Sequence, residues 1–200
     1  RFALVVQLSS IALAGFAILR AEFFIRAWGL MDHTLFEWIY IFGQGFIYDI
    51  AFISYFYIPF VILLLFLPNK WLHNVFFKVL TQITTSLILY GLCFNAIAEW
   101  FFWDEFGVRF NFISVDYLIY RREVTDNIMQ SYPVFWILHI LFILTAVLFY
   151  FLRAPLIKAI SVKENFSQRA VIAICLLLIP GMAFLFLNQS QRSFSDNNYV

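Results

Sequence analysis

Charged residues are scarce in this 200-residue sequence, where Asp, Glu, Lys and Arg together make up 12% of the positions. A soluble domain has about 25%, so the shortage excludes an ordinary soluble fold. The net charge of +1 leaves no surplus of positive charge for binding nucleic acid. The two cysteines are too few for a disulfide-framed secreted domain. Cys93 and Cys175 each lie in an apolar run, where a thiol most often behaves as a small hydrophobic side chain.

Hydrophobic residues fill 64% of the sequence, with 27 Phe, 10 Tyr and 6 Trp among them, which excludes a disordered chain. Five apolar runs come within a residue or two of the roughly 20 residues that a helix needs to cross a bilayer. They cover residues 2–19, 46–67, 79–98, 134–152 and 170–187. The runs are continuous, whereas barrel strands would alternate apolar and polar residues. We therefore predict an all-α membrane protein with five transmembrane helices.

The first run is expected to be a retained span rather than a signal peptide. No small-residue cleavage site follows it, and Arg20, Glu22 and Arg26 come directly after. Residues 1–190 are expected to form a single five-helix transmembrane domain. Because the sequence starts at Arg1 and runs out in a polar stretch over 193–200, we expect it to be a fragment of a longer protein.

The distribution of Lys and Arg predicts the orientation in the membrane. An odd number of spans places the two ends on opposite sides, so the connections 68–78 and 153–169 share one face with the N-terminus. That face carries Arg1, Lys70, Lys78, Arg153, Lys158, Lys163 and Arg169. On the other face, the remaining Lys and Arg are spread over more than twice the length. We predict a cytoplasmic N-terminus and an extracytoplasmic C-terminus.

Sequence patterns for metal binding or catalysis are missing. The three histidines, His33, His73 and His139, lie in different segments, and neither HExxH nor CxxC occurs. Asn95 and Glu99, four residues apart, could be a ligand pair, although a polar helix end reaching interfacial water is the simpler interpretation. No GxSxG, Walker or GxGxxG motif is present, so we assign no catalytic residue and no metal ligand.

Asp49 is the most informative charge, because it opens the second apolar run. An acid at membrane depth costs several kcal/mol unless it is paired or close to water. One interpretation places Asp49 in the headgroup zone. The other is an ion pair with Arg20, Arg26 or Arg109, which would lie on the same outer face.

The outer segment 99–133 mixes Trp, Phe and Tyr with charges, a composition typical of the membrane interface. Val124 and Ile128 favour a short amphipathic interfacial helix there. Guanidinium groups are well suited to lipid phosphate, and the segment supplies three, on Arg109, Arg121 and Arg122. The alternative is that they only pair with acids of the same segment, namely Asp116, Glu123 and Asp126.

This segment also carries a sequence pattern. It reads RFNFISVDYL over residues 109–118, followed by Tyr120, Glu123–Val124, Asn127–Ile128 and Ser131–Tyr132–Pro133. The pattern is similar to the N-terminal membrane domain of the lipoteichoic acid synthase-like family, which comprises membrane-anchored phosphoglycerol and phosphoethanolamine transferases of the alkaline phosphatase and sulfatase superfamily. A second match is Gly45-x-x-x-Asp49, with Pro59 further along the same run.

The resemblance implies a metal-dependent phospho-group transferase in the bacterial cytoplasmic membrane, working on the cell envelope. In that family, five helices precede an extracytoplasmic α/β domain with a threonine nucleophile and a divalent metal, usually manganese. The nucleophile attacks a phospholipid head-group phosphodiester and passes the group to a glycan or lipid. That machinery lies outside this sequence, whose residues 191–200 would begin the linker to it.

The resulting hypothesis is a membrane anchor that presents phosphatidylglycerol or phosphatidylethanolamine to its own C-terminal catalytic domain. Its partners would be membrane lipids, without nucleic acid. Head-group contacts are expected from Arg109, Arg121 and Arg122, and loop ordering from Asp49, Asp116, Tyr117, Glu123 and Asn127. The alternative is a small polytopic transporter or channel subunit, because Pro59 and Pro180–Gly181 could break the second and fifth helices. A purely structural membrane partner is the third possibility.

Overall fold

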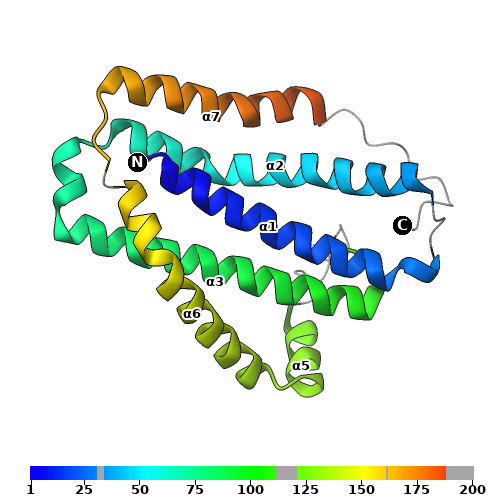
Figure 1. The fold of residues 1–200 in the computed structure, drawn as a ribbon. Helices are drawn as coiled ribbons and strands as arrows, with labels where there is room; N and C mark the ends of the chain where they lie inside the picture. Colours follow the sequence, from blue (N-terminus) through cyan, green and yellow to red (C-terminus); the bar gives the residue numbers. More distant parts are fainter. Residues whose placement is uncertain (31–33, 111–120, 161, 188–200) are drawn as a thin grey trace. The chain divides into compact units, whose positions relative to one another are not determined.

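The computed structural model describes residues 1–30, 34–110, 121–160 and 162–187 (Figure 1). Its five long helices are apolar enough to cross a membrane. They are α1 (Ala3–Arg26), α2 (Leu35–Phe66), α3 (Val75–Phe106), α6 (Val134–Ile160) and α7 (Phe166–Leu187). Shorter helices are η1 (Trp28–Leu30), η2 (Asn69–His73) and α5 (Arg121–Ser131). No strand occurs in the described ranges, so the prediction of an all-α membrane protein with five spanning helices is confirmed.

Helices α2 and α3 are longer than the apolar runs that predicted them. Each has 32 residues, or about 48 Å at 1.5 Å per residue, whereas the hydrocarbon core is about 30 Å thick. Helix α2 begins at Leu35, where the Oγ1 of Thr34 accepts a hydrogen bond from the backbone N–H of Glu37 at 3.4 Å. Polar and charged residues end an apolar run without ending a helix, so much of the expected loop sequence 20–45 and 99–106 is helical.

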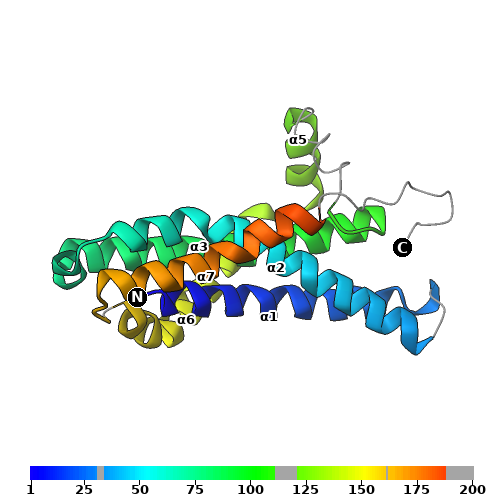
Figure 2. The same ribbon diagram turned by 90° about the horizontal axis from the view of Figure 1, so that it is seen from above.

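The described chain divides into two compact units, and α3 and α6 each contribute to both. The first unit contains α1, α2 and α7, and α2 packs against both of the others (Figures 1 and 2). Along α1 and α2, the ring pairs Phe16–Phe52 and Phe24–Phe42 have centroids 6.0 and 5.4 Å apart. The two pairs show that α1 and α2 run antiparallel, an arrangement that also brings Arg20 beside Asp49.

A hydrogen bond inside the apolar region joins α2 to α7. The Tyr57 hydroxyl donates to the carbonyl oxygen of Leu176 at 2.7 Å. That carbonyl lies one turn before Pro180, which has no N–H to give it. The facing side of α7 is made of small buried residues, Ala173, Pro180 and Ala183, which lets the two backbones approach closely.

The prolines do not break the helices as the sequence suggested. Helix α2 continues through Pro59 and α7 through Pro180 and Gly181. In α7 the reason is visible, because the Tyr57 hydroxyl satisfies the carbonyl that Pro180 leaves without a partner. The helix breaks that the transporter alternative invoked at these positions do not occur.

Two arginine side chains cover the C-terminal end of α2. Nη1 of Arg1 donates to the Leu67 carbonyl at 2.7 Å, and Nη1 of Arg169 donates to the Leu65 and Leu67 carbonyls at 3.0 and 2.9 Å. The last carbonyls of a helix have no intrahelical donor, and the negative end of the helix dipole favours cations. Burial, and after it the neighbouring Arg169, lowers the pKa of Arg1, while Glu164 acts in the opposite direction.

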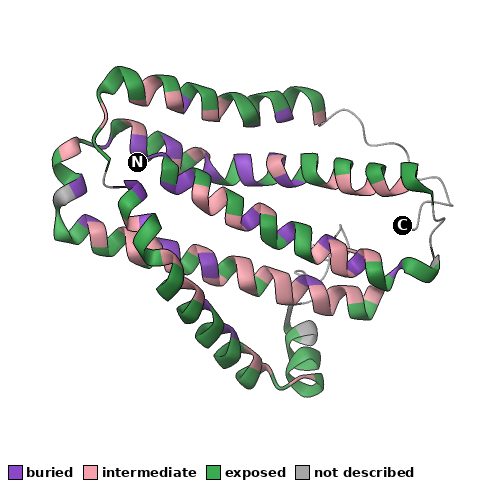
Figure 3. Ribbon diagram, in the orientation of Figure 1, coloured by how far each residue is buried: buried purple, intermediate pink, exposed green. Residues whose placement is uncertain are grey.

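In the second unit, buried residues are few. Thr85 and Leu89 are four residues apart on α3, Leu141 and Thr145 are four residues apart on α6, and Glu99 lies further along α3. Most of α6 is exposed, including its large apolar side chains (Figure 3). An exposed apolar surface of this kind is what a lipid-facing helix requires.

The hydrogen bond between α2 and α7 can be tested with Tyr57→Phe, which removes only the hydroxyl. We expect a loss of about 1 kcal/mol in the free energy of unfolding, since hydrogen bonds between membrane helices contribute from about 0.6 to 1.7 kcal/mol. Reversible unfolding in mixed micelles, followed by circular dichroism, measures it.

Tyr55→Phe is the matched control, because Tyr55 lies on the same helix with 41% of its surface exposed. Equal losses in the two variants would show that the Tyr57 hydroxyl does not join the helices.

Candidate functional site

The chain folds back on itself directly after α3. Gly107 has a φ of +67°, and its N–H donates to the Trp103 carbonyl at 2.8 Å. This left-handed conformation at a helix end favours glycine, because any larger residue carries a steric penalty there. The turn lets residues 108–110 return along the helix that they have just left.

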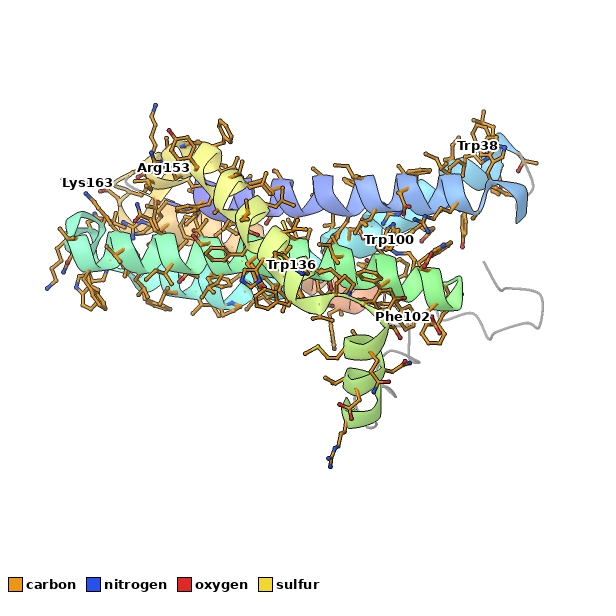
Figure 4. The ribbon with its side chains drawn as sticks, turned by 90° about the horizontal axis from the view of Figure 1, so that it is seen from below. Trp38, Trp100, Phe102, Trp136, Arg153 and Lys163 are labelled. Carbon is orange, nitrogen blue, oxygen red and sulfur yellow. The ribbon has the colours of Figure 1, made fainter. Side chains whose placement is uncertain are left out.

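Aromatic rings hold the returning segment in place. The Phe102 ring lies 4.6 Å from that of Phe106 and 5.1 Å from that of Phe110, measured between centroids. Phe102 and Trp100 project from the last turns of α3 (Figure 4). On the neighbouring position, Phe101 contacts Tyr132 with centroids 4.6 Å apart. The two contacts of Phe102 hold the chain before and after Arg109.

Arg109 meets an acid on α3 that lies ten residues earlier. Its Nε donates to Oε1 of Glu99 at 2.6 Å. The Glu99 side chain is 5% exposed, whereas that of Arg109 is 36% exposed. One partner is therefore buried and the other still reaches the surface. Glu99 is not the simple polar helix end that the sequence suggested.

The other residues of the head-group hypothesis have different positions. Arg122 is exposed on α5. Asn127 is exposed on the same helix, where its Oδ1 accepts a hydrogen bond from the Ser131 hydroxyl at 3.2 Å. Arg121 and Glu123 belong to α5, but the description does not extend to their side chains. Asp116 and Tyr117 lie outside the described residues.

Asp49 forms the ion pair that was one of its two predicted alternatives. Nη2 of Arg20 donates to its Oδ2 at 2.6 Å, and both residues are buried. Asp49 lies about 26 Å from Phe66 along α2, a length close to the roughly 30 Å of a hydrocarbon core. The pair therefore joins α1 to α2 at a depth where unpaired charges are costly.

Gly45 leaves the space that this ion pair occupies. A Cβ at position 45 would overlap Nε and Cζ of Arg20, so the guanidinium lies directly on the glycine backbone. The Gly45-x-x-x-Asp49 spacing puts both residues on one face of α2. The pattern noted in the sequence therefore has a local physical reason.

An aromatic cluster, which hydropathy did not predict, follows the ion pair toward the connection between α1 and α2. Phe24 contacts the rings of Trp28, Trp38 and Phe42 at centroid distances of 5.6, 5.8 and 5.4 Å. Trp38 and Phe42 are one turn apart on α2, a spacing that could have revealed the cluster. Its rings hold the two helices together beyond Asp49.

The described residues contain no group of three or more His, Cys, Asp or Glu side chains that could hold a metal ion. His139 contacts its own helix, with Nδ1 2.7 Å from the Phe135 carbonyl oxygen. Glu99 therefore belongs to no group of this kind among the described residues.

Comparisons of this chain with protein families, curated proteins and solved structures found no match.

A pair of glycine variants tests the space above Gly45. Gly43→Ala should stabilise α2 by up to about 1 kcal/mol, since alanine is the better helix former and position 43 is open. Gly45→Ala should instead lower stability by about 1–2 kcal/mol, because the new methyl group displaces Arg20 from Asp49. The measurement is again reversible unfolding in micelles. Equal stabilisation by both alanines would show that Arg20 does not need the space.

Proposed function

We propose that this chain is the membrane domain of a phosphoglycerol or phosphoethanolamine transferase of the lipoteichoic acid synthase-like kind. It anchors a catalytic domain outside the bacterial cytoplasmic membrane and presents a phospholipid head group to it. Holding the donor lipid beside the catalytic centre makes the transfer effectively intramolecular, which can lower a barrier by several kcal/mol.

The observation that carries the proposal is the position of Arg109. Its backbone is fixed by aromatic contacts, its Nε is bound to Glu99, and its side chain remains 36% exposed. A guanidinium is a planar fork that fits two phosphate oxygens, and a fixed one loses less entropy on binding. Arg122, exposed on the polar helix α5, is a second cation in the segment between α3 and α6.

The kinds of basic residue support the proposed orientation. All four lysines, at positions 70, 78, 158 and 163, fall in or beside the connections assigned to the cytoplasmic face. Arg153 and Lys163 project near the junction of α6 and α7 (Figure 4). In the segments assigned to the outer face every basic residue is arginine, which binds phosphate through a fork rather than as a point charge.

The divalent metal of such an enzyme, manganese in the usual case, would belong to the catalytic domain. Among the described residues no set of ligands fits one. This chain therefore contributes anchoring and lipid contacts, and we assign it no chemical step.

The buried Arg20–Asp49 pair favours the alternative of a small transporter or channel subunit. Ionisable residues at membrane depth often mark ion or substrate paths. The same pair also joins α1 to α2, since each charge has the other as its partner and the missing side chain of Gly45 leaves room for Arg20. Reading the parent open reading frame downstream of Val200 distinguishes the two functions. A downstream phosphatase-like domain supports the transferase, and an immediate stop codon contradicts it.

Replacing Arg122 with alanine should weaken substrate use without unfolding the helices. In the full-length protein, reconstituted with phosphatidylglycerol and Mn²⁺, we expect Arg122→Ala to lower kcat/KM for diacylglycerol release about tenfold, the effect of losing one charge-assisted phosphate contact. Lys163→Ala makes the same change of charge at an exposed position near the start of α7 and is the control. Turnover unchanged by Arg122→Ala would remove Arg122 from this role.

A further inference from the structure

We propose that Glu99 is a positioning residue that holds Arg109 in a phosphate-binding orientation. This inference rests on the proposed function, in which Arg109 contacts a lipid head group. It adds the group that makes this contact selective for a phosphate carrying two free oxygens, whether in a phospholipid or in a soluble phosphate ester.

The first argument comes from the asymmetry of the ion pair. Glu99 is 5% exposed at its side chain and Arg109 is 36% exposed. A buried carboxylate needs a partner, and Arg109 supplies it. If neutralising Glu99 were the whole role of Arg109, a guanidinium buried to the same extent would serve equally well. Here the cation extends from the buried acid to the surface.

The second argument concerns the atoms of the guanidinium. The bond to Glu99 uses Nε, which carries one of the five N–H donors. Neither Nη atom donates to a described residue. A planar group held at Nε keeps its two Nη atoms, which carry the other four N–H donors, together at its far edge. That edge matches the two unesterified oxygens of a phosphodiester.

The third argument is the rigidity of the surroundings. Gly107 turns the chain back, and the Phe102–Phe110 contact fixes the residue next to Arg109. A side chain that is already oriented loses less conformational entropy when a ligand binds. Lysine could not replace Arg109. A lysine has a single ammonium nitrogen, which cannot bind Glu99 and also present two parallel N–H donors to a phosphate.

A double-mutant cycle tests the inference on the complete chain in maltoside micelles. Binding of dioctanoyl-phosphatidylglycerol is measured by calorimetry for the unchanged chain, Glu99→Ala, Arg109→Ala and the double variant. We expect Arg109→Ala to weaken binding about tenfold or more and Glu99→Ala about fivefold. In the Arg109→Ala background, Glu99→Ala should change the affinity less than about twofold, because a positioning residue acts only through the group it holds.

Three further variants keep the test valid if Glu99→Ala does not fold. Glu99→Gln retains an acceptor for Nε without its charge and should bind between the unchanged chain and Glu99→Ala. Arg109→Lys should bind as weakly as Arg109→Ala. Glu105→Gln removes an exposed acid of the same helix and should leave the affinity unchanged.

Different outcomes separate this inference from the proposed function. If Arg109→Ala lowers affinity while Glu99→Ala and Glu99→Gln do not, Glu99 has no positioning role and lipid presentation stands. If Glu99→Ala weakens binding equally with and without Arg109, its effect is structural and the inference fails. If Arg109→Ala leaves binding unchanged, both fail at this site.

Glycerol 3-phosphate and dioctanoylglycerol identify the source of the phosphate. We expect the lipid to bind at least about tenfold more tightly than either fragment, because the acyl chains and the phosphate contribute together. Equal affinity for glycerol 3-phosphate would assign the site to a soluble ester, which contradicts lipid presentation and leaves the role of Glu99 intact.

Discussion

Polar groups that this chain carries into apolar surroundings must find their partners within the protein, because lipid offers none. The first unit shows how this constraint organises the helices. The Leu176 carbonyl, left without an N–H by Pro180, receives the Tyr57 hydroxyl. The Asp49 carboxylate accepts a hydrogen bond from the Arg20 guanidinium. The last carbonyls of α2 receive Arg1 and Arg169. Each of these contacts connects α2 to another segment, so the hydrogen bonds that satisfy polar groups also hold the helices together.

Helix α2 is therefore the central element of its unit. Its buried residues include Asp49, Ser54 and Tyr57 as well as apolar side chains. Apolar packing gives little preference for one register over another when lipid is equally apolar. The Arg20–Asp49 ion pair near one end of the antiparallel pair and the contact of Arg1 with the Leu67 carbonyl near the other fix the alignment of α1 with α2. The aromatic contacts between them then fall into the same register.

Hydropathy predicted the five spanning helices, because a long apolar run has no other stable arrangement in a bilayer. It did not predict the ends of α2 and α3, since helix formation continues through residues such as Glu37 and Asp104 that end an apolar run. For Asp49 the sequence offered three arginines on one face and could not choose between them. The space above Gly45 decides in favour of Arg20, and that space depends on how two helices approach each other.

The contact between Glu99 and Arg109 was missed for a different reason. Ten residues separate them, a distance that helical periodicity does not connect, and the contact exists only because Gly107 reverses the chain. The glycine after a long helix was a visible signal of a C-cap. The glycine alone did not predict the course of residues 108–110, which depends on the contacts of Phe102 with Phe106 and Phe110.

The two ion pairs differ in a way that bears on function. Arg20 and Asp49 are both buried, so each charge has its partner within the protein and little of either side chain is exposed. The contact between Glu99 and Arg109 is also 2.6 Å long, but 36% of the Arg109 side chain is exposed. A charge pair closed on both sides stabilises a helix interface. In a pair with only the acid buried, the cation is held in position and stays accessible to a ligand. This asymmetry is the physical basis for placing a phosphate at Arg109.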